Sequence, residues 1–284
     1  MSAAPISSHG APFAELSTRQ VALVGSRQAS VMAEVLHAGS GRPLIFLSGL
    51  VGTNFHWAEV VVRIRHRVEC RAVQVPLLEL EGDDCGVPGV KEMMARYIRE
   101  HIGRPAVLVG SSFGGHVALR LAIEDPALVG GLVLAGSSGL AEKPILGAEL
   151  PSKAREYIEE RVAELFYDKS KMSQDDVTRA HAELNDRAKA RAMIKLSRSC
   201  RRDHLGKLIH RIQAPTLVLW GRNDIVTPPE AAIEFAEHIP DARLVWIEQC
   251  GHAPMVEKPD EFSESLLNFC DELDAIDNRR NSAL

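Results

Sequence analysis

The sequence predicts an α/β fold with a mostly parallel central sheet, helices on both of its faces and an inserted helical cap. Short runs of branched apolar residues alternate with helical segments of ten or more residues, which is typical of a parallel sheet. The chain has 284 residues, of which 45% are hydrophobic, enough to bury one large core. The alternation stops between residues 136 and 210, where the pattern is helical and charged.

The predicted strands are short and apolar. Residues 44–47 have no polar position, which is typical of a strand buried on both faces. Strands are predicted at residues 19–24, 31–36, 44–47, 68–75, 106–110, 132–135, 215–220 and 242–248. Helices are predicted at residues 55–65, 91–101, 153–166, 175–198, 229–238 and 260–273, and directly after Ser112.

The cap divides the predicted core into two parts. Residues 1–18 and 275–284 are expected to be tails, and the core comprises residues 19–136 and 211–274. The cap, residues 137–210, is expected to cover the carboxyl edge of the sheet, where open α/β folds bind their ligands.

The cap is basic in an acidic chain. Residues 153–211 carry fifteen Lys or Arg against ten Asp or Glu, whereas the whole chain has a formal net charge of −5. One interpretation is a solvated helix surface. The other is that one or two arginines face the pocket and bind an anionic group of the substrate. The candidates are Arg187, Arg191, Arg198, Arg201 and Arg202.

The composition excludes several classes of protein. The net negative charge offers no basic surface for nucleic acid, and no apolar run is long enough for a membrane span. Residues 1–18 lack the charged start and apolar stretch of a secretion signal. Five irregularly spaced cysteines without a C-x-x-C pair indicate reduced thiols and no zinc site. We therefore expect a cytoplasmic protein that needs no metal and acts on a small molecule. Nucleic-acid and membrane partners are not expected. The oligomeric state is left open, with a homodimer as one possibility.

One motif lies between a predicted strand and a predicted helix. Gly110-Ser111-Ser112-Phe113-Gly114 fits G-x-S-x-G with Ser112 at its centre, whereas Ser111 does not fit because Val109 stands where the first glycine is needed. A serine in a tight turn between strand and helix needs neighbours without Cβ atoms. The pattern therefore indicates an exposed nucleophile, and the alternative is a Gly/Ser loop that caps a helix.

Two more chemical groups follow later strands. Asp224 comes shortly after the strand at 215–220, and His252 follows the strand at 242–248. A serine hydroxyl needs a base to remove its proton, and the base needs a carboxylate to fix its tautomer. The order Ser112, Asp224, His252 is one that a single sheet edge can bring together.

These three motifs resemble those of the α/β-hydrolase superfamily, over nearly the whole chain from residue 19 to 273. The resemblance implies Ser112 as nucleophile, Asp224 as orienting acid and His252 as general base, with the N–H groups of Phe113 and Leu50 as oxyanion donors. It also implies that no cofactor is needed. The motifs are Gly110-Ser111-Ser112-Phe113-Gly114-Gly115, Trp220-Gly221-Arg222-Asn223-Asp224 with Thr227-Pro228, and Cys250-Gly251-His252-Ala253-Pro254 with Glu257-Lys258-Pro259.

The sequence departs from the family's pattern at two places. Many members have His-Gly in the oxyanion loop, where this chain has Ser48-Gly49, so Ser48 is expected to form hydrogen bonds within the loop. The loop after the strand at 68–75 lacks the usual Asp and Gly-x-Gly. An alternative interpretation of Asp224 is that it is a turn residue without a catalytic role. Three further histidines are interpreted as surface or core residues: His56, His116 and His181. His56 and His116 are close enough in sequence to the predicted site residues to line the pocket.

The leading functional hypothesis is a carboxylesterase-like serine hydrolase that cleaves a small carboxylic ester or related acyl compound through an acyl-enzyme on Ser112. An alternative is hydrolysis of a carbon–carbon bond, as in meta-cleavage product hydrolases, whose cap and Ser-Phe/Met-Gly-Gly motif are similar. That chemistry usually accompanies a carboxylate clamp. A hypothesis from another functional class is that the protein is a non-catalytic receptor that binds a small molecule.

Overall fold

The computed structural model describes residues 16–26, 30–142 and 154–282, and its centre is one eight-stranded sheet. The order is β1-β2-β4-β3-β5-β6-β7-β8. β1 pairs antiparallel with β2, β2 antiparallel with β4, and every other pair is parallel, so the prediction of a mostly parallel sheet is confirmed. The strands are β1 (Ser17–Val24), β2 (Ser30–Ala38), β3 (Arg42–Leu47), β4 (Val68–Gln74), β5 (Ala106–Ser111), β6 (Val129–Ala135), β7 (Thr216–Gly221) and β8 (Ala242–Ile247).

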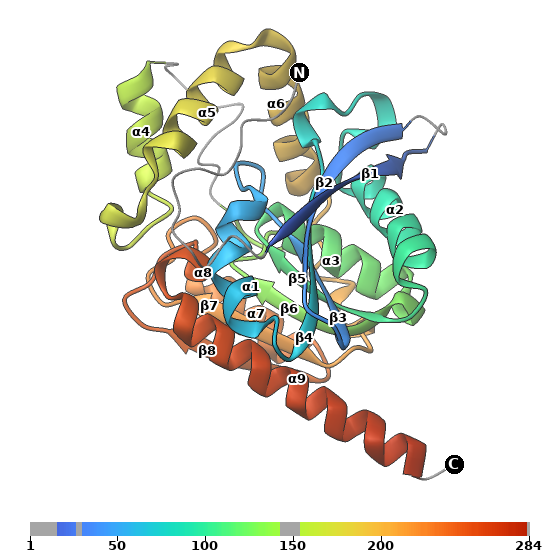
Figure 1. The fold of residues 1–284 in the computed structure, drawn as a ribbon. Helices are drawn as coiled ribbons and strands as arrows, with labels where there is room; N and C mark the ends of the chain where they lie inside the picture. The colour runs from blue at the N-terminus through green and yellow to red at the C-terminus, as the bar shows by residue number, and fades with distance from the viewer. Residues whose placement is uncertain (1–15, 27–29, 143–153, 283–284) are drawn as a thin grey trace.

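Helices cover both faces of the sheet (Figure 1). On one face α1 (Ala58–Ile64) packs against α9 (Pro259–Ser282) over an apolar cluster that includes Leu44 and Phe46. On the other face α2 (Val87–Tyr97), α3 (Phe113–Glu124) and α7 (Pro229–His238) cover a second cluster that includes Ile45 and Leu47. Residues 44–47 of β3 thus enter opposite clusters in alternation, which is why this part of the strand has no polar position.

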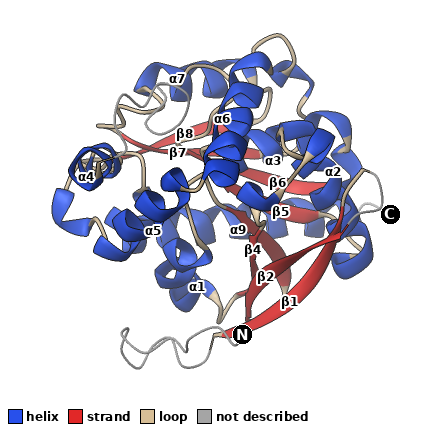
Figure 2. Cartoon of the chain, turned by 90° about the horizontal axis from the view of Figure 1, so that it is seen from above, coloured by secondary structure: helices blue, strands red, loops and turns tan. Residues whose placement is uncertain are grey.

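The cap helices lie together above one end of the sheet (Figures 1 and 2). They are α4 (Arg155–Ala163), α5 (Gln174–Asn185) and α6 (Arg187–Arg202). The prediction of a single helix at 175–198 is wrong, because α5 ends before Asp186 and α6 begins after it. The Asp186 carboxylate accepts the backbone N–H groups of Ala188 (2.8 Å) and Lys189 (3.0 Å) and so caps the start of α6.

The predicted tails need correction at both ends. α9 does not end at residue 273 but continues to Ser282, and Arg42 at the start of β3 binds two carboxylates of the added part, Asp274 and Asp277. β1 begins at Ser17, inside the tail predicted for residues 1–18. Residues 1–15 and 283–284 of these tails, and residues 143–153 of the predicted cap, lie outside the described residues.

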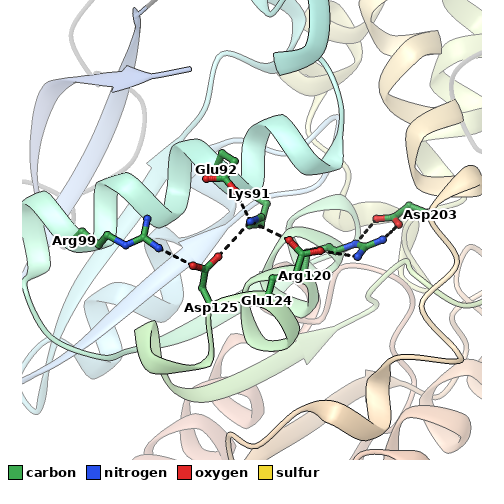
Figure 3. A network of polar contacts seen from close by, with 7 residues as sticks. All are labelled: Lys91, Glu92, Arg99, Arg120, Glu124, Asp125 and Asp203. Atoms are coloured by element: carbon green, nitrogen blue, oxygen red, sulfur yellow. Dashed lines mark hydrogen bonds and ion pairs between the residues drawn. The ribbon is translucent and has the colours of Figure 1, made fainter. Parts of the chain in front are cut away.

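Figure 3 shows a line of ion pairs that joins α2, α3 and the end of α6. Asp203, directly after α6, binds the Arg120 guanidinium of α3 and accepts a hydrogen bond from His116 Nε2 (3.1 Å). Burial alone would raise the pKa of Asp203, but Arg120 and His116 outweigh it and hold that pKa well below its usual range. The charged residues of the line are Lys91, Glu92, Arg99, Arg120, Glu124, Asp125 and Asp203.

Asp203→Asn is expected to lower the free energy of unfolding by about 2 kcal/mol at pH 7, since a charge-assisted bond between cap and core is lost. Because the pKa of Asp203 is lower in the folded state, its carboxylate stabilises the fold at pH values above its ordinary pKa of 3.8. This contribution is lost as the pH falls toward the pKa of the folded state. Urea unfolding at pH 7, 5 and 3.5 should therefore show a difference from the parent protein that shrinks only at the lowest pH. Asp260→Asn, at an exposed carboxylate, is the control. A difference that stays constant with pH would contradict this prediction.

Candidate active site

Ser112 lies in a strained turn between β5 and α3. Its backbone has φ 52° and ψ −118°, a conformation that costs free energy in a non-glycine residue. The turn is possible because its neighbours are small: a Cβ at Gly110 would lie 2.5 Å from Gly115 Cα, and one at Gly114 2.2 Å from Leu47 O. The Ser112 N–H donates to Gly136 O (3.1 Å). Helix packing and hydrogen bonds therefore fix the position of this serine.

Two residues that the sequence predicts as oxyanion donors line the same cavity as Ser112. They are Leu50, in the loop after β3, and Phe113, the first residue of α3. Within the part of the chain that the structure describes, neither N–H donates a hydrogen bond. The Ser112 hydroxyl lies on the side of this loop, since a Cβ at Gly49 would be 3.5 Å from Ser112 Oγ. Donors without partners beside a hydroxyl are the components of an oxyanion hole.

Ser48 fixes the start of the oxyanion loop. Its hydroxyl accepts a hydrogen bond from Trp57 Nε1 (3.0 Å) and donates to Thr53 O (3.3 Å). The bond to Thr53 lies within the loop, as expected from the sequence. The Gly52 N–H donates to Gly49 O (3.1 Å), which closes a turn over residues 49–52.

Asp224 and His252 form a buried pair at the ends of β7 and β8. His252 Nδ1 lies 2.8 Å from Asp224 Oδ2. The other oxygen, Oδ1, accepts the N–H groups of Val226 (2.8 Å) and Thr227 (3.0 Å). The Thr227 hydroxyl donates to Oδ2 (2.7 Å). The carboxylate therefore has one orientation, in which Nδ1–H of the imidazole donates to it and Nε2 is left as an acceptor.

Ser112 and His252 line one cavity but are not bonded to each other. Both residues belong to the described part of the chain, and no hydrogen bond joins the Ser112 hydroxyl to the imidazole of His252. The fold thus brings Asp224 and His252 into direct contact, and it places Ser112, Leu50 and Phe113 on the same cavity wall.

Glu257, part of the third motif, holds the loop of His252. Its buried carboxylate accepts the N–H groups of Gly251 (2.7 Å) and of Asp168 in the cap (2.9 Å). Burial raises the pKa of Glu257. The His252 N–H donates in turn to Leu165 O of the cap (2.8 Å). Cap backbone and imidazole loop are therefore tied directly together.

The cavity between cap and core encloses about 1110 Å³, including its open mouth, and most of its wall is apolar. The charged or titratable side chains in the described wall are His56, Glu142, Asp176, Cys200 and His252. Burial raises the pKa of Glu142. The apolar residues are Leu50, Val51, Trp57, Phe113, Val162, Leu165, Phe166, Ala180, Met193, Val226, Ala253, Met255 and Val256.

The hypothesis of a cap arginine facing the pocket is wrong. Met193, Ser197 and Cys200 line the cavity from α6, at spacings of four and three residues that define one helix face. The five predicted arginines are all exposed, and none of them belongs to the described wall. They are Arg187, Arg191, Arg198, Arg201 and Arg202.

Other candidate groups have structural partners. His116 is fully buried and contacts Ser138 (3.5 Å) and Asp203, whereas His56 lines the cavity and contacts Asp176 (2.9 Å). Cys200 is a poor nucleophile, because burial raises the pKa of its thiol far above the usual range. Among residues 16–26, 30–142 and 154–282, no three His, Cys, Asp or Glu side chains are grouped as a metal site requires.

The comparisons with known proteins concern the family and the fold. The model of the Alpha/beta hydrolase family matches residues 44–265. The chain is 28% identical to the pimeloyl-[acyl-carrier protein] methyl ester esterase of Nitrosomonas europaea, over 79% of this chain and 94% of the relative. It is 33% identical to the 2-hydroxymuconate semialdehyde hydrolase of Pseudomonas putida, over 66% and 72%.

The fold also matches that of known hydrolases. One solved structure, MGS-MChE2, an alpha/beta hydrolase from a sediment metagenome of the Mar Chica lagoon, Morocco, is 28% identical with a TM-score of 0.71, and 85% of this chain and 96% of that chain are covered. None of the described helices has the length and apolar character needed to cross a membrane. With the fold, the family model and these relatives in agreement, the chain belongs to the α/β-hydrolase family and is an enzyme of the hydrolase class.

Proposed function

We propose that the protein is a serine hydrolase that cleaves esters with an apolar acyl group. Ser112 Oγ attacks the ester carbonyl while His252 Nε2 takes its proton, and the N–H groups of Leu50 and Phe113 stabilise the oxyanion. Collapse of this intermediate expels the alcohol, which receives the proton from His252. Water then gives a proton to His252 and attacks the acyl-enzyme, and the acid leaves as Ser112 regains its proton.

The proposed proton transfer requires the Ser112 hydroxyl to reach His252. Rotation about the Cα–Cβ bond of Ser112 moves its oxygen without moving the backbone. In free enzymes such bonds are often long and tighten only with substrate. The pairing of Asp224 with His252 (2.8 Å) already supports the acceptor state of Nε2 that this step needs.

The pocket wall is the observation that supports this substrate class. Apolar side chains from cap and core surround the space beside Ser112, and the described wall contains carboxyl groups but no Lys or Arg. An ionised acyl group would lose its hydration there and find no Lys or Arg among the described wall residues, which costs several kcal/mol. A neutral, apolar acyl group would instead gain from burial.

Carbon–carbon bond hydrolysis is the second candidate, because the Pseudomonas putida relative is named as a 2-hydroxymuconate semialdehyde hydrolase. Dienoate substrates of this kind carry a carboxylate. The described wall offers that group no cationic partner, and Glu142 and Asp176 would repel it. The esterase proposal is therefore ranked first.

A substrate comparison tests this ranking. We expect p-nitrophenyl butyrate to be hydrolysed with a kcat/KM at least about 100-fold above that of p-nitrophenyl hemisuccinate, which adds a carboxylate at the end of the acyl chain. A 2-hydroxy-6-oxo-hexa-2,4-dienoate should react more slowly still. Faster turnover of the dienoate would reverse the ranking. A receptor would neither hydrolyse the esters nor react with a fluorophosphonate.

A further inference from the structure

We propose that Arg179 of the cap is a positioning residue that holds the oxyanion turn, residues 49–52, in its working geometry. This inference rests on the proposed function, in which the Leu50 N–H is an oxyanion donor. Arg179 itself is not among the residues that line the cavity. Its effect on the reaction would pass through the loop after β3.

The guanidinium contacts the turn directly. Arg179 Nη2 donates to Val51 O (2.8 Å) and to Asp176 Oδ1 (2.7 Å), and Glu183 lies 3.7 Å from Nη1. The Arg179 side chain is 29% exposed, so most of it is shielded from solvent. Arg179 and Asp176 both belong to α5, whereas Val51 belongs to the core. A cap helix thus donates a hydrogen bond to the backbone of the oxyanion turn.

The contact fixes the peptide unit between Val51 and Gly52 at both ends. Its carbonyl oxygen accepts from Arg179, and its N–H donates to Gly49 O (3.1 Å). Rotation of this unit would break both bonds at once. Because Leu50 lies inside the same four-residue turn, the direction of its N–H depends on the turn staying closed.

A second contact supports the same loop. His56, just beyond the turn, places Nε2 2.9 Å from Asp176 Oδ2, and its Nδ1 accepts the Thr53 N–H (3.4 Å). Burial alone would raise the pKa of Asp176, but His56 and Arg179 outweigh it and lower that pKa. Asp176 therefore stays charged and orients Arg179 on one side and His56 on the other.

An oxyanion donor acts only if it points to where negative charge develops, and the loss of one donor costs about 10²–10³ in kcat. A donor that is retained but free to turn away should cost less. We expect Arg179→Met to lower kcat for p-nitrophenyl butyrate about 10- to 100-fold while KM stays within about 3-fold. Arg179→Lys, which can still donate to Val51 O, should recover part of this loss.

Inhibitor binding separates positioning from a general structural effect. A trifluoromethyl ketone forms a hemiketal oxyanion on the serine, whereas butan-1-ol, a neutral compound without a carbonyl group, binds the pocket without the oxyanion donors. Arg179→Met should weaken the ketone by the same factor as kcat and leave inhibition by butan-1-ol unchanged. Arg155→Met is the matched control, because within the described part of the chain the Arg155 guanidinium donates its hydrogen bonds to two side chains of α5, Thr178 (3.1 Å) and Gln174 (3.1 Å). It should change neither constant.

Amide hydrogen exchange gives a readout that does not depend on catalysis. Arg179→Met should exchange faster in the peptide that covers residues 49–52, and Arg155→Met should not. The inference about Arg179 is overturned if Arg179→Met changes neither the exchange of residues 49–52 nor the affinity for the ketone. The proposed function can still stand in that case, if Ser112→Ala abolishes activity. If the parent protein hydrolyses no ester, the proposed function fails, and unchanged exchange in Arg179→Met then overturns the inference by itself. Should Arg179→Met not fold, Asp176→Asn is judged by exchange in residues 49–52 alone, because Asp176 also lines the cavity.

Discussion

Ser112→Ala is expected to abolish ester hydrolysis, lowering kcat by about 10⁴- to 10⁶-fold. The reason is that Ser112 is the proposed nucleophile, and the Cys200 thiol, which lines the same cavity, stays protonated because burial raises its pKa. The measurement is the initial rate with p-nitrophenyl butyrate, together with the mass of the protein after treatment with a fluorophosphonate. The parent protein should gain one phosphonyl group and the variant none.

Ser111→Ala is the control for this change. Ser111 is the neighbouring serine at the end of β5, and its loss should reduce kcat by no more than about 10-fold, because it has no proposed role in the acyl transfer. Two results would contradict the prediction. One is a Ser112→Ala protein that keeps a tenth of the parent rate, and the other is a phosphonyl group attached to a different residue.

Asp224→Asn is expected to lower kcat by about 10³- to 10⁴-fold with little change in KM. The hydrogen bonds decide how the amide must lie. The Oδ1 position accepts two backbone N–H groups, from Val226 and Thr227, so the amide oxygen must occupy it. The amide nitrogen is then placed against His252 Nδ1, which must become an acceptor. The ring proton moves to Nε2, and the base that Ser112 needs is lost.

The kcat of Asp224→Asn, measured from pH 6 to 9, checks this prediction, with circular dichroism to verify the fold. Thr227→Val is a graded comparison, because the Thr227 hydroxyl donates to Asp224 Oδ2 (2.7 Å) but is not needed for the tautomer. It should cost about 10-fold or less. If Asp224→Asn retained more than a tenth of the parent kcat, the orienting role of this carboxylate would have to be abandoned.

The sequence was informative wherever local pattern determines structure. The run Leu44–Leu47 has one explanation, a strand covered on both faces, and the glycines around Ser112 have one physical use, a turn too tight for Cβ atoms. Asp224 and His252 could be paired in advance because both follow apolar strands of a parallel sheet, whose ends meet at one edge. The mostly parallel architecture and the family followed from the same observations.

What the sequence could not provide depends on contacts between distant residues or on which face of a helix turns inward. Charge counting found a basic cap, yet the α6 arginines point to solvent while Met193 and Ser197 line the pocket. The added part of α9 binds Arg42, more than two hundred positions earlier in the chain. Arg179 shows no motif, since its partner is a backbone carbonyl in another part of the fold.

The two N–H bonds accepted by Glu257 make the cap unsuitable for wholesale grafting. A chimaera with a cap taken from a relative would have to place a backbone N–H where that of Asp168 lies and a backbone carbonyl where that of Leu165 lies, or the loop that carries His252 would lose its support. The portion open to exchange is therefore the solvent side of α4 and α5. The backbone at 165–168 has to be inherited together with His252, so selectivity in this protein can be re-engineered only by side-chain changes that leave this segment in place.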